Sequence, residues 1–212
     1  MWKQCDLSIQ QVNISPTTSC FYAIKCIDGI LSNSKDASES QLQNQGFIKD
    51  TAGYMDATDP TIEENLGLGQ RYLWTKDGNA FDMEGPLYTD YCQMNILILN
   101  GVQDNIKLYP SSNEFVLISE NNDYKVDIED AVLKVCHMQV NSPIILSHDN
   151  ALSEGNAIYP IMKSNIKTFS IAAGLQSFSQ VDLFQGEVPT RLVVGLTSSA
   201  AFNGSINKNP LN

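Results

Sequence analysis

Positive charge is scarce in this sequence. The chain has 212 residues, with 13 Lys and Arg against 24 Asp and Glu, and its formal net charge is −11. Proteins that bind DNA or RNA neutralise phosphates with clustered Lys and Arg, and no basic stripe is found here. We therefore expect no direct contact with nucleic acid.

Long apolar runs are also lacking. No stretch approaches the roughly 20 apolar residues that cross a bilayer. The N-terminal residues Met1–Cys5 are not a charged region followed by an apolar core, as a secretory signal would be. We expect a protein that is neither secreted nor bound to membranes. It would act in the cytoplasm or nucleus, or in a virion if it is viral.

Histidine and cysteine are too few and too scattered for the common catalytic and zinc sites. The two histidines are His137 and His148, and the five cysteines form no Cys-x-x-Cys pair. Cys136 and His137 are adjacent, and neighbours on a strand point to opposite faces, so they are not expected to form a nucleophile–base pair. His148 lies beside Asp149 in a polar stretch, where a capping or surface role is expected. We identify no catalytic, cofactor-binding or metal-ligating residue, and we expect no enzyme and no cofactor.

One cluster of acidic residues is a candidate metal site. Such carboxylates supply the oxygen ligands that calcium prefers, but their spacing matches no EF-hand loop. We interpret the cluster as a solvated loop. Its members are Asp50, Asp56, Asp59, Glu63 and Glu64.

Two segments have helical features. Cys20, Ile24, Ile27 and Leu31 follow helical spacing, which predicts a helix over about residues 21–31, and residues 17–19 offer an N-cap. Gly29 weakens this helix. Residues 143–152 are the second candidate. The polar stretch 32–46 predicts an exposed loop or a frayed helix.

Most of the remaining chain shows short apolar segments separated by turn residues. Residues 71–75 and 80–83 flank an Asp-Gly turn and predict a hairpin. The long alternating segment 124–135 slips in phase near Asp130, which predicts a bulge. Further strands are expected at 7–14, 94–99, 103–109, 115–119, 159–162, 166–171 and 190–196. This pattern favours an all-β sandwich or barrel.

Several ordered blocks of the sequence resemble the double jelly-roll major capsid (hexon-type) proteins of polinton-like (Maverick-like) and adintovirus-like elements. The resemblance covers nearly the whole chain, and its most specific block runs from Leu183 to Gly195. The blocks are Tyr22–Leu31, Ser38–Leu42, Lys49–Asp56, Phe81–Asp90, Leu99–Val102, Leu183–Gly195, Phe202–Ser205 and Asn209–Asn212.

The resemblance implies a structural role. It implies an antiparallel jelly-roll sandwich, here a partial double jelly roll with one or two short helices in loops. Residues 1–121 would be the later part of the first jelly roll, and residues 122–212 the opening part of a second, truncated one. Partners would be further copies of the chain, in homotrimeric capsomers and capsomer–capsomer contacts, and other capsid proteins. The chain would be viral or an endogenous remnant of a viral gene.

Two other functions are compatible with a β-rich chain. The first is a single β-sandwich module that binds carbohydrate or protein, which an exposed aromatic cluster on one sheet face would indicate. The second is a hydrolase on a sandwich scaffold, which requires convergent carboxylates or a metal. Asp50, Asp56 and Asp59 are the residues to test for the metal.

Overall fold

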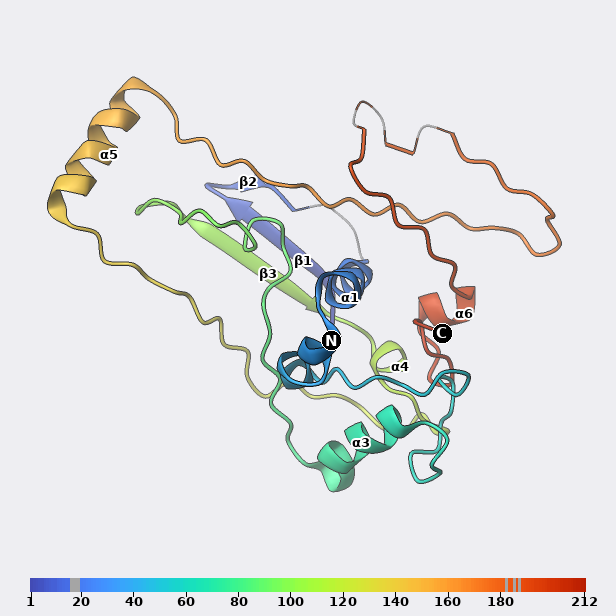
Figure 1. Ribbon diagram of the computed structural model, residues 1–212. Helices are drawn as coiled ribbons and strands as arrows, with labels where there is room; N and C mark the ends of the chain where they lie inside the picture. Colours follow the sequence, from blue (N-terminus) through green and yellow to red (C-terminus); the bar gives the residue numbers. More distant parts are fainter. Residues whose placement is uncertain (16–19, 182, 185, 187) are drawn as a thin grey trace.

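The fold is built on one small antiparallel sheet. The computed structural model describes residues 1–15, 20–181, 183–184, 186 and 188–212. Within these ranges, β1 (Trp2–Ile9), β2 (Val12–Asn13) and β3 (Asp104–Pro110) form a sheet in the order β2-β1-β3 (Figure 1). The tight turn between β1 and β2 places Gln10 and Gln11 at positive φ, 45° and 71°. The central strand is thus β1, and β3 is an edge strand.

One face of this sheet is covered by α1 (Phe21–Ser32), and the core of the protein lies between them (Figure 1). Leu7 is only 1% exposed. The Lys25 ammonium lies 5.1 Å from the centre of the Tyr88 ring, a cation–π contact at the margin of the core. The buried core residues are Cys5, Phe21 and Tyr88, with Trp2, Leu87, Ile106 and Leu108 packed against them.

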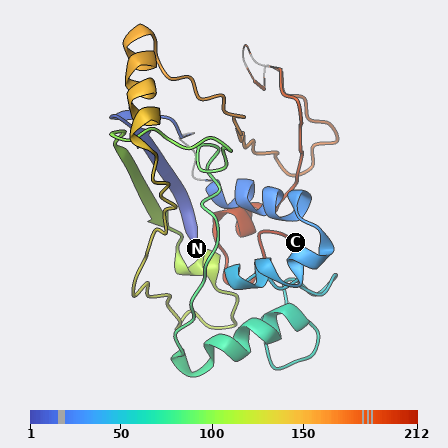
Figure 2. The same cartoon turned by 60° about the vertical axis from the view of Figure 1, so that its left-hand side comes forward.

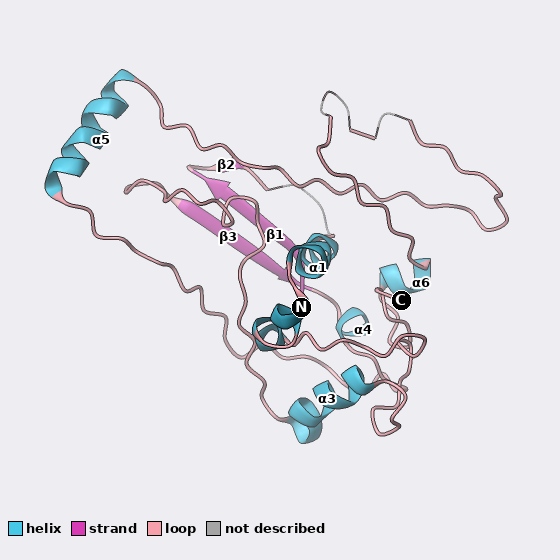
Figure 3. Ribbon diagram, viewed as in Figure 1, coloured by secondary structure: helices cyan, strands magenta, loops and turns pink. Residues whose placement is uncertain are grey.

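Short helices form most of the other regular structure (Figure 3). The chain is therefore mixed α/β with little strand. The helices are α2 (Lys35–Ser38), α3 (Leu66–Thr75), α4 (Asn113–Val116), α5 (Ser142–Glu154) and α6 (Ser199–Asn203), and the 3-10 helices are η1 (Gln41–Gln45) and η2 (Lys76–Gly78).

The predicted all-β jelly-roll sandwich, and with it the partial double jelly roll, is wrong. The described residues contain one three-stranded sheet, and no second sheet packs on it. The expected strands at 124–135, 159–162, 166–171 and 190–196 have no strand partner and no regular secondary structure, and 94–99 consists of bends and irregular backbone. A strand is defined by hydrogen bonds to a neighbour, which an alternating sequence cannot supply by itself. The β-sandwich binding module and the sandwich hydrolase lose their scaffold for the same reason.

The predicted hairpin at 71–83 is also wrong. Residues 66–75 form α3, because the Asn65 side chain accepts a hydrogen bond from the Leu68 N–H (3.3 Å) and caps the helix. The turn itself is present, with Asp77 and Gly78 at positive φ. It brings the ring of Phe81 onto Trp74, with centroids 5.1 Å apart.

Smaller corrections concern 115–119 and Asp130. The first segment contains part of α4 and no strand. At Asp130 there is no bulge, because no ladder exists there. Its carboxylate instead accepts a hydrogen bond from the Ala131 N–H at 2.7 Å.

Several predicted elements are confirmed. The helix over about 21–31 is α1, the helix at 143–152 is α5, and the strand at 103–109 is β3. The first strand is confirmed in part, since β1 begins at Trp2 and the chain turns at Gln10. In the polar stretch 32–46, α2 and η1 form. The predicted N-cap at 17–19 lies outside the described residues, and the division at residue 121 stays a prediction.

Candidate functional site

Asp56 is the centre of a polar site that joins the C-terminal segment to the loop before α3. Its Oδ1 accepts a hydrogen bond from the Asn209 N–H at 2.7 Å. Its Oδ2 accepts from Lys208 Nζ at 3.0 Å and from Asn212 Nδ2 at 2.9 Å. The Asn209 backbone hydrogen bond lowers the pKa of Asp56 most, and Lys208 and Asn212 add to this effect.

Asp50 is the second carboxylate of the site, and we call Asp50 and Asp56 together the acidic docking site. Its carboxylate accepts a 2.6 Å hydrogen bond from Arg71 NH2, and the Asn209 side chain donates to it at 3.4 Å. Arg71 also donates to the Ile48 carbonyl at 2.8 Å. Asn209 is buried and donates in addition to the Met55 carbonyl at 3.3 Å. The acidic docking site, Asp50 and Asp56, therefore binds part of the chain itself.

The N-terminus of α3 holds this site in place. Asn65 is 1% exposed, and its carbonyl oxygen accepts from the N–H groups of Thr51 and Leu68, both at 3.3 Å. Thr51 Oγ1 in turn accepts from the Leu66 N–H at 3.1 Å. Close packing at Gly67 completes the contact, because a Cβ there would lie 2.6 Å from Asp50 Oδ1. The loop carrying Asp50 is thus fixed against the first turn of α3.

The acidic cluster considered as a calcium site has a different use in the structure. Asp50 and Asp56 face Arg71, Lys208 and N–H donors, which repel a cation. Asp59 accepts from the N–H (2.8 Å) and Oγ1 (2.6 Å) of Thr61 within one turn. Glu63 and Glu64 are exposed. The described residues contain no group of three or more His, Cys, Asp or Glu arranged to hold a metal.

The cysteines and histidines lie apart from this site. Cys136 and His137 are exposed on an extended segment, as Cys92 is exposed on a turn. Cys5 is buried in the core, and burial, together with nearby Cys92 and Asp6, raises the pKa of its thiol to about 11. Its thiol is therefore protonated at neutral pH.

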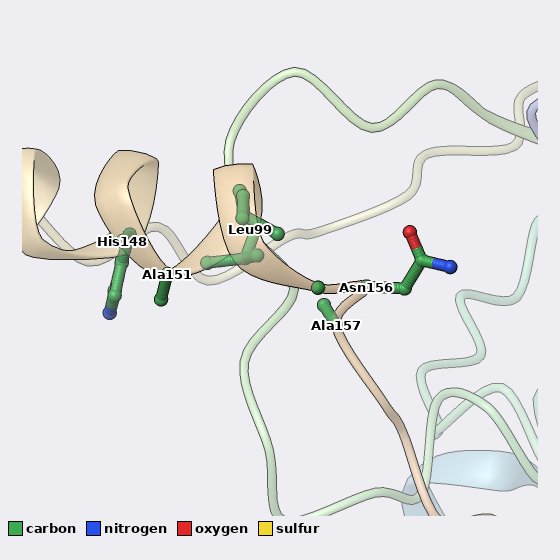
Figure 4. Close-up of a pocket in the computed structure, with 7 residues that line it drawn as sticks. Leu99, His148, Ala151, Asn156 and Ala157 are labelled. Carbon is green, nitrogen blue, oxygen red and sulfur yellow. The ribbon is translucent and has the colours of Figure 1, made fainter.

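His148 lies on α5 at a small pocket (Figure 4). The pocket has a volume of about 220 Å³, below the range of typical ligand sites. His148 and Asn156 lie at opposite ends of it and do not point toward each other, so no polar groups converge. The other lining residues are Leu99, Ala151, Leu152, Gly155 and Ala157.

A long exposed arm, residues 120–181, is the most unusual feature of the surface (Figures 1 and 2). It runs extended to α5 and back, and α5 itself has no buried residue. Contacts that tie it to the rest of the protein include Val126 N–H to Asn113 Oδ1 (3.0 Å) and the Lys134–Glu84 ion pair (2.7 Å). The Leu99 N–H donates to Tyr159 Oη at 3.1 Å, and the Ser164 N–H donates to Asp90 at 2.7 Å.

The exposed arm is rich in apolar side chains that face solvent. Val132 is 74% exposed and Ile158 is 87% exposed. Monomeric proteins rarely expose apolar patches larger than a few hundred Å². The sequence predicted part of this region as strands (124–135, 159–162 and 166–171) and part as a helix (143–152), and neither prediction indicated that these apolar side chains are exposed. They are Tyr124, Ile128, Val132, Leu133, Val135, Met138, Val140, Ile144, Ile145, Leu146, Leu152, Ile158, Ile161, Met162, Phe169, Ile171, Leu175, Phe178 and Val181.

Among the residues that the structure describes, none of the helices combines the length and apolarity needed to cross a membrane.

Comparison with known proteins gives one informative similarity. No model of a known protein family matches the chain, and no solved structure matches it. The chain is similar to a protein of Caenorhabditis elegans named uncharacterized protein F54H12.2, with 28% identity over 120 residues. The matched region is 55% of this chain and 29% of that protein, so the chain spans less than a third of the relative that it matches.

Proposed function

We propose that this protein is a non-catalytic structural subunit that associates with further copies of itself. The observation that carries the proposal is the exposed arm, whose apolar side chains face solvent along its whole length. Burying apolar surface between chains releases about 25 cal/mol per Å², so such an arm gains stability by association. A subunit that exchanges extended segments with its neighbours buries the apolar side chains and supplies hydrogen-bond partners for the unpaired backbone.

We propose first that the chain is a subunit of a capsid-type assembly. The support is the set of sequence blocks that resemble hexon-type capsid proteins, whose subunits associate as trimers. The double jelly roll of those proteins is not part of the proposal. The site of action would be a virion, or the cytoplasm or nucleus before assembly.

Sedimentation velocity over a series of protein concentrations tests this proposal. We expect the mass to rise with concentration and to include trimers. Replacing Val132, Val135 and Met138 together by Ser removes exposed apolar surface from the arm and should weaken association at least tenfold. A matched control replaces Ile62 and Leu73, which are exposed outside the arm, and should leave association unchanged. A monomer at every concentration would contradict the proposal.

A further inference from the structure

The outer edge of β3 offers backbone groups that no described residue satisfies. The hydrogen bonds of Leu7 on β1, which lies opposite Ile106 on β3, show in which direction the N–H and C=O of Ile106 point. The Leu7 N–H donates to Ser15 Oγ at 3.0 Å, and its carbonyl accepts from the Ile14 N–H at 2.9 Å, both on the side away from β3. In an antiparallel pair, such a residue exchanges no hydrogen bond with its opposite partner.

It follows that the N–H and C=O of Ile106 point away from β1, to the outer edge. Hydrogen-bonded and non-hydrogen-bonded pairs alternate along the ladder, so the same holds for Leu108, which lies opposite Cys5. The strand order places β3 last, so the described residues provide no further strand beyond it. Ile106 and Leu108 thus present two donors and two acceptors with the spacing that an added strand requires.

The two faces of β3 define which strand would fit. Ile106 and Leu108 pack toward the core, whereas Asn105, Lys107 and Tyr109 are exposed on the opposite face. A strand added beside β3 must continue both faces, so it must alternate apolar and polar residues in the same phase. A negative side chain opposite Lys107 would be favourable, because opposite charges on neighbouring strands attract.

Residues 124–129 of the exposed arm have this pattern. Tyr124, Val126 and Ile128 alternate with Lys125, Asp127 and Glu129. The segment is already extended with its polar side chains on one side, since Lys125 Nζ lies 2.8 Å from Asp127 Oδ2. Apart from Val126, whose N–H donates to Asn113, these residues are exposed.

We propose that residues 124–129 of a second copy of this chain add to the outer edge of β3 as a fourth strand. This inference rests on the proposed function and names the surface through which the copies would associate. A copy's own segment is held away from this edge by the Val126 N–H, which donates to Asn113, and by the Lys134–Glu84 ion pair after the segment. In the added strand, Asp127 or Glu129 lies opposite Lys107, and Val126 and Ile128 extend the apolar face.

Charge reversal in the donor segment tests the inference. Asp127→Lys with Glu129→Lys should raise the dissociation constant of the full-length chain at least tenfold in sedimentation equilibrium. The control, Asp36→Lys in the exposed helix α2 with Glu39→Lys at its C-cap, changes the charge equally and should have no such effect. Adding Lys107→Glu to the donor variant restores the charge pair and should recover association. Circular dichroism of each variant checks that the fold is retained.

Hydrogen exchange shows whether a segment of a second copy or of the same chain pairs with the outer edge of β3. The amides of Ile106 and Leu108 should exchange fast in dilute monomer and at least tenfold more slowly in the assembled protein. Protection in the monomer would mean that the chain's own arm pairs with β3, which overturns the inference. Assembly that is unaffected by the donor variant overturns the inference and leaves the proposed function standing. A chain that stays monomeric at the highest concentration overturns both.

Discussion

Among single residues, Asp56 joins the C-terminal segment to the loop before α3. Three donors from residues 208–212 converge on its carboxylate. Asp56→Ala leaves the buried N–H of Asn209 without its acceptor, and removal of such a partner costs about 1–3 kcal/mol. We expect a loss of this size in the free energy of unfolding, measured with urea. The amide of Asn209 should also lose its protection from exchange.

The matched control for Asp56 lies three residues away. Asp59 accepts hydrogen bonds only from Thr61 within its own turn, as far as the described residues show. Asp59→Ala should therefore cost less than Asp56→Ala and leave the exchange of Asn209 unchanged. Equal losses in both variants would show that the C-terminal contact contributes nothing.

The same carboxylate makes the C-terminal contact sensitive to acid. The pKa of Asp56 in the folded protein lies below its ordinary value, chiefly because of the Asn209 hydrogen bond. A group with a lowered folded pKa stabilises the protein above its unfolded pKa of about 3.9, and this stabilisation is lost as pH falls through the folded pKa. Exchange at Asn209, corrected for the intrinsic rate, should thus stay slow from neutral pH to about pH 4 and rise below it.

Thiol reactivity should separate buried from exposed cysteines. With a pKa of about 11, the Cys5 thiol is ionised in about one molecule in a thousand at pH 8, and its side chain is buried. Cys92 and Cys136 are exposed. A maleimide should modify Cys92 and Cys136 at least a hundredfold faster than Cys5, as mass spectrometry of the peptides would show. Rapid labelling of Cys5 without denaturant would place it at the surface.

Among the elements, α1 contains Gly29 and α3 contains Gly67, and these two glycines should respond oppositely to alanine. Alanine favours a helix over glycine by up to about 1 kcal/mol. At Gly29 in α1, a new Cβ meets no atom within 4 Å, so Gly29→Ala should stabilise the protein by about 0.5–1 kcal/mol. At Gly67 in α3, the Cβ would lie 2.8 Å from the Lys49 carbonyl, so Gly67→Ala should destabilise it. Thermal unfolding of the two variants measures the difference, and a common sign would contradict this account.

The helices also show what local sequence could predict. The apolar spacing of α1 was sufficient, because that helix buries one face on the sheet. The helix α3 was missed, because its cap depends on Asn65, which is buried by contacts with Thr51 from an earlier loop. The Asp-Gly turn after it was predicted correctly, but a turn does not determine whether the residues before it are strand or helix.

The acidic docking site shows which contacts between distant parts of the chain could not be predicted from the sequence. Its carboxylates were visible as a cluster in the sequence, which we interpreted as a solvated loop. Their partners were not, since Asn209 and Lys208 are brought to Asp56 only by the path of the whole chain. Similarly, the strand predicted from alternation in residues 124–135 is wrong, because pairing depends on a partner strand that the pattern does not specify.

At the scale of the whole molecule, the C-terminal segment should remain attached even when the arm is cut. Residues 198–212 contact the rest of the protein through Asp56, through packing of α6 near α4, and through the Ser119 N–H, which donates to the Ile206 carbonyl at 3.0 Å. The arm is exposed and contains trypsin sites at Lys125, Lys134, Lys163 and Lys167. Exposed segments with few buried contacts are cut first.

Limited trypsin digestion under native conditions should therefore cut the arm and yield two pieces that co-elute in gel filtration. In denaturant they should separate, since no disulfide is formed among the free cysteines. The Asp56→Ala variant should release the C-terminal piece without denaturant, because the hydrogen bonds to Asn209, Lys208 and Asn212 are then lost. Assembly should slow cleavage of the arm at high protein concentration, if the arm is the surface that copies share. Release of the C-terminal piece from the unaltered protein would show that the acidic docking site is too weak to hold it.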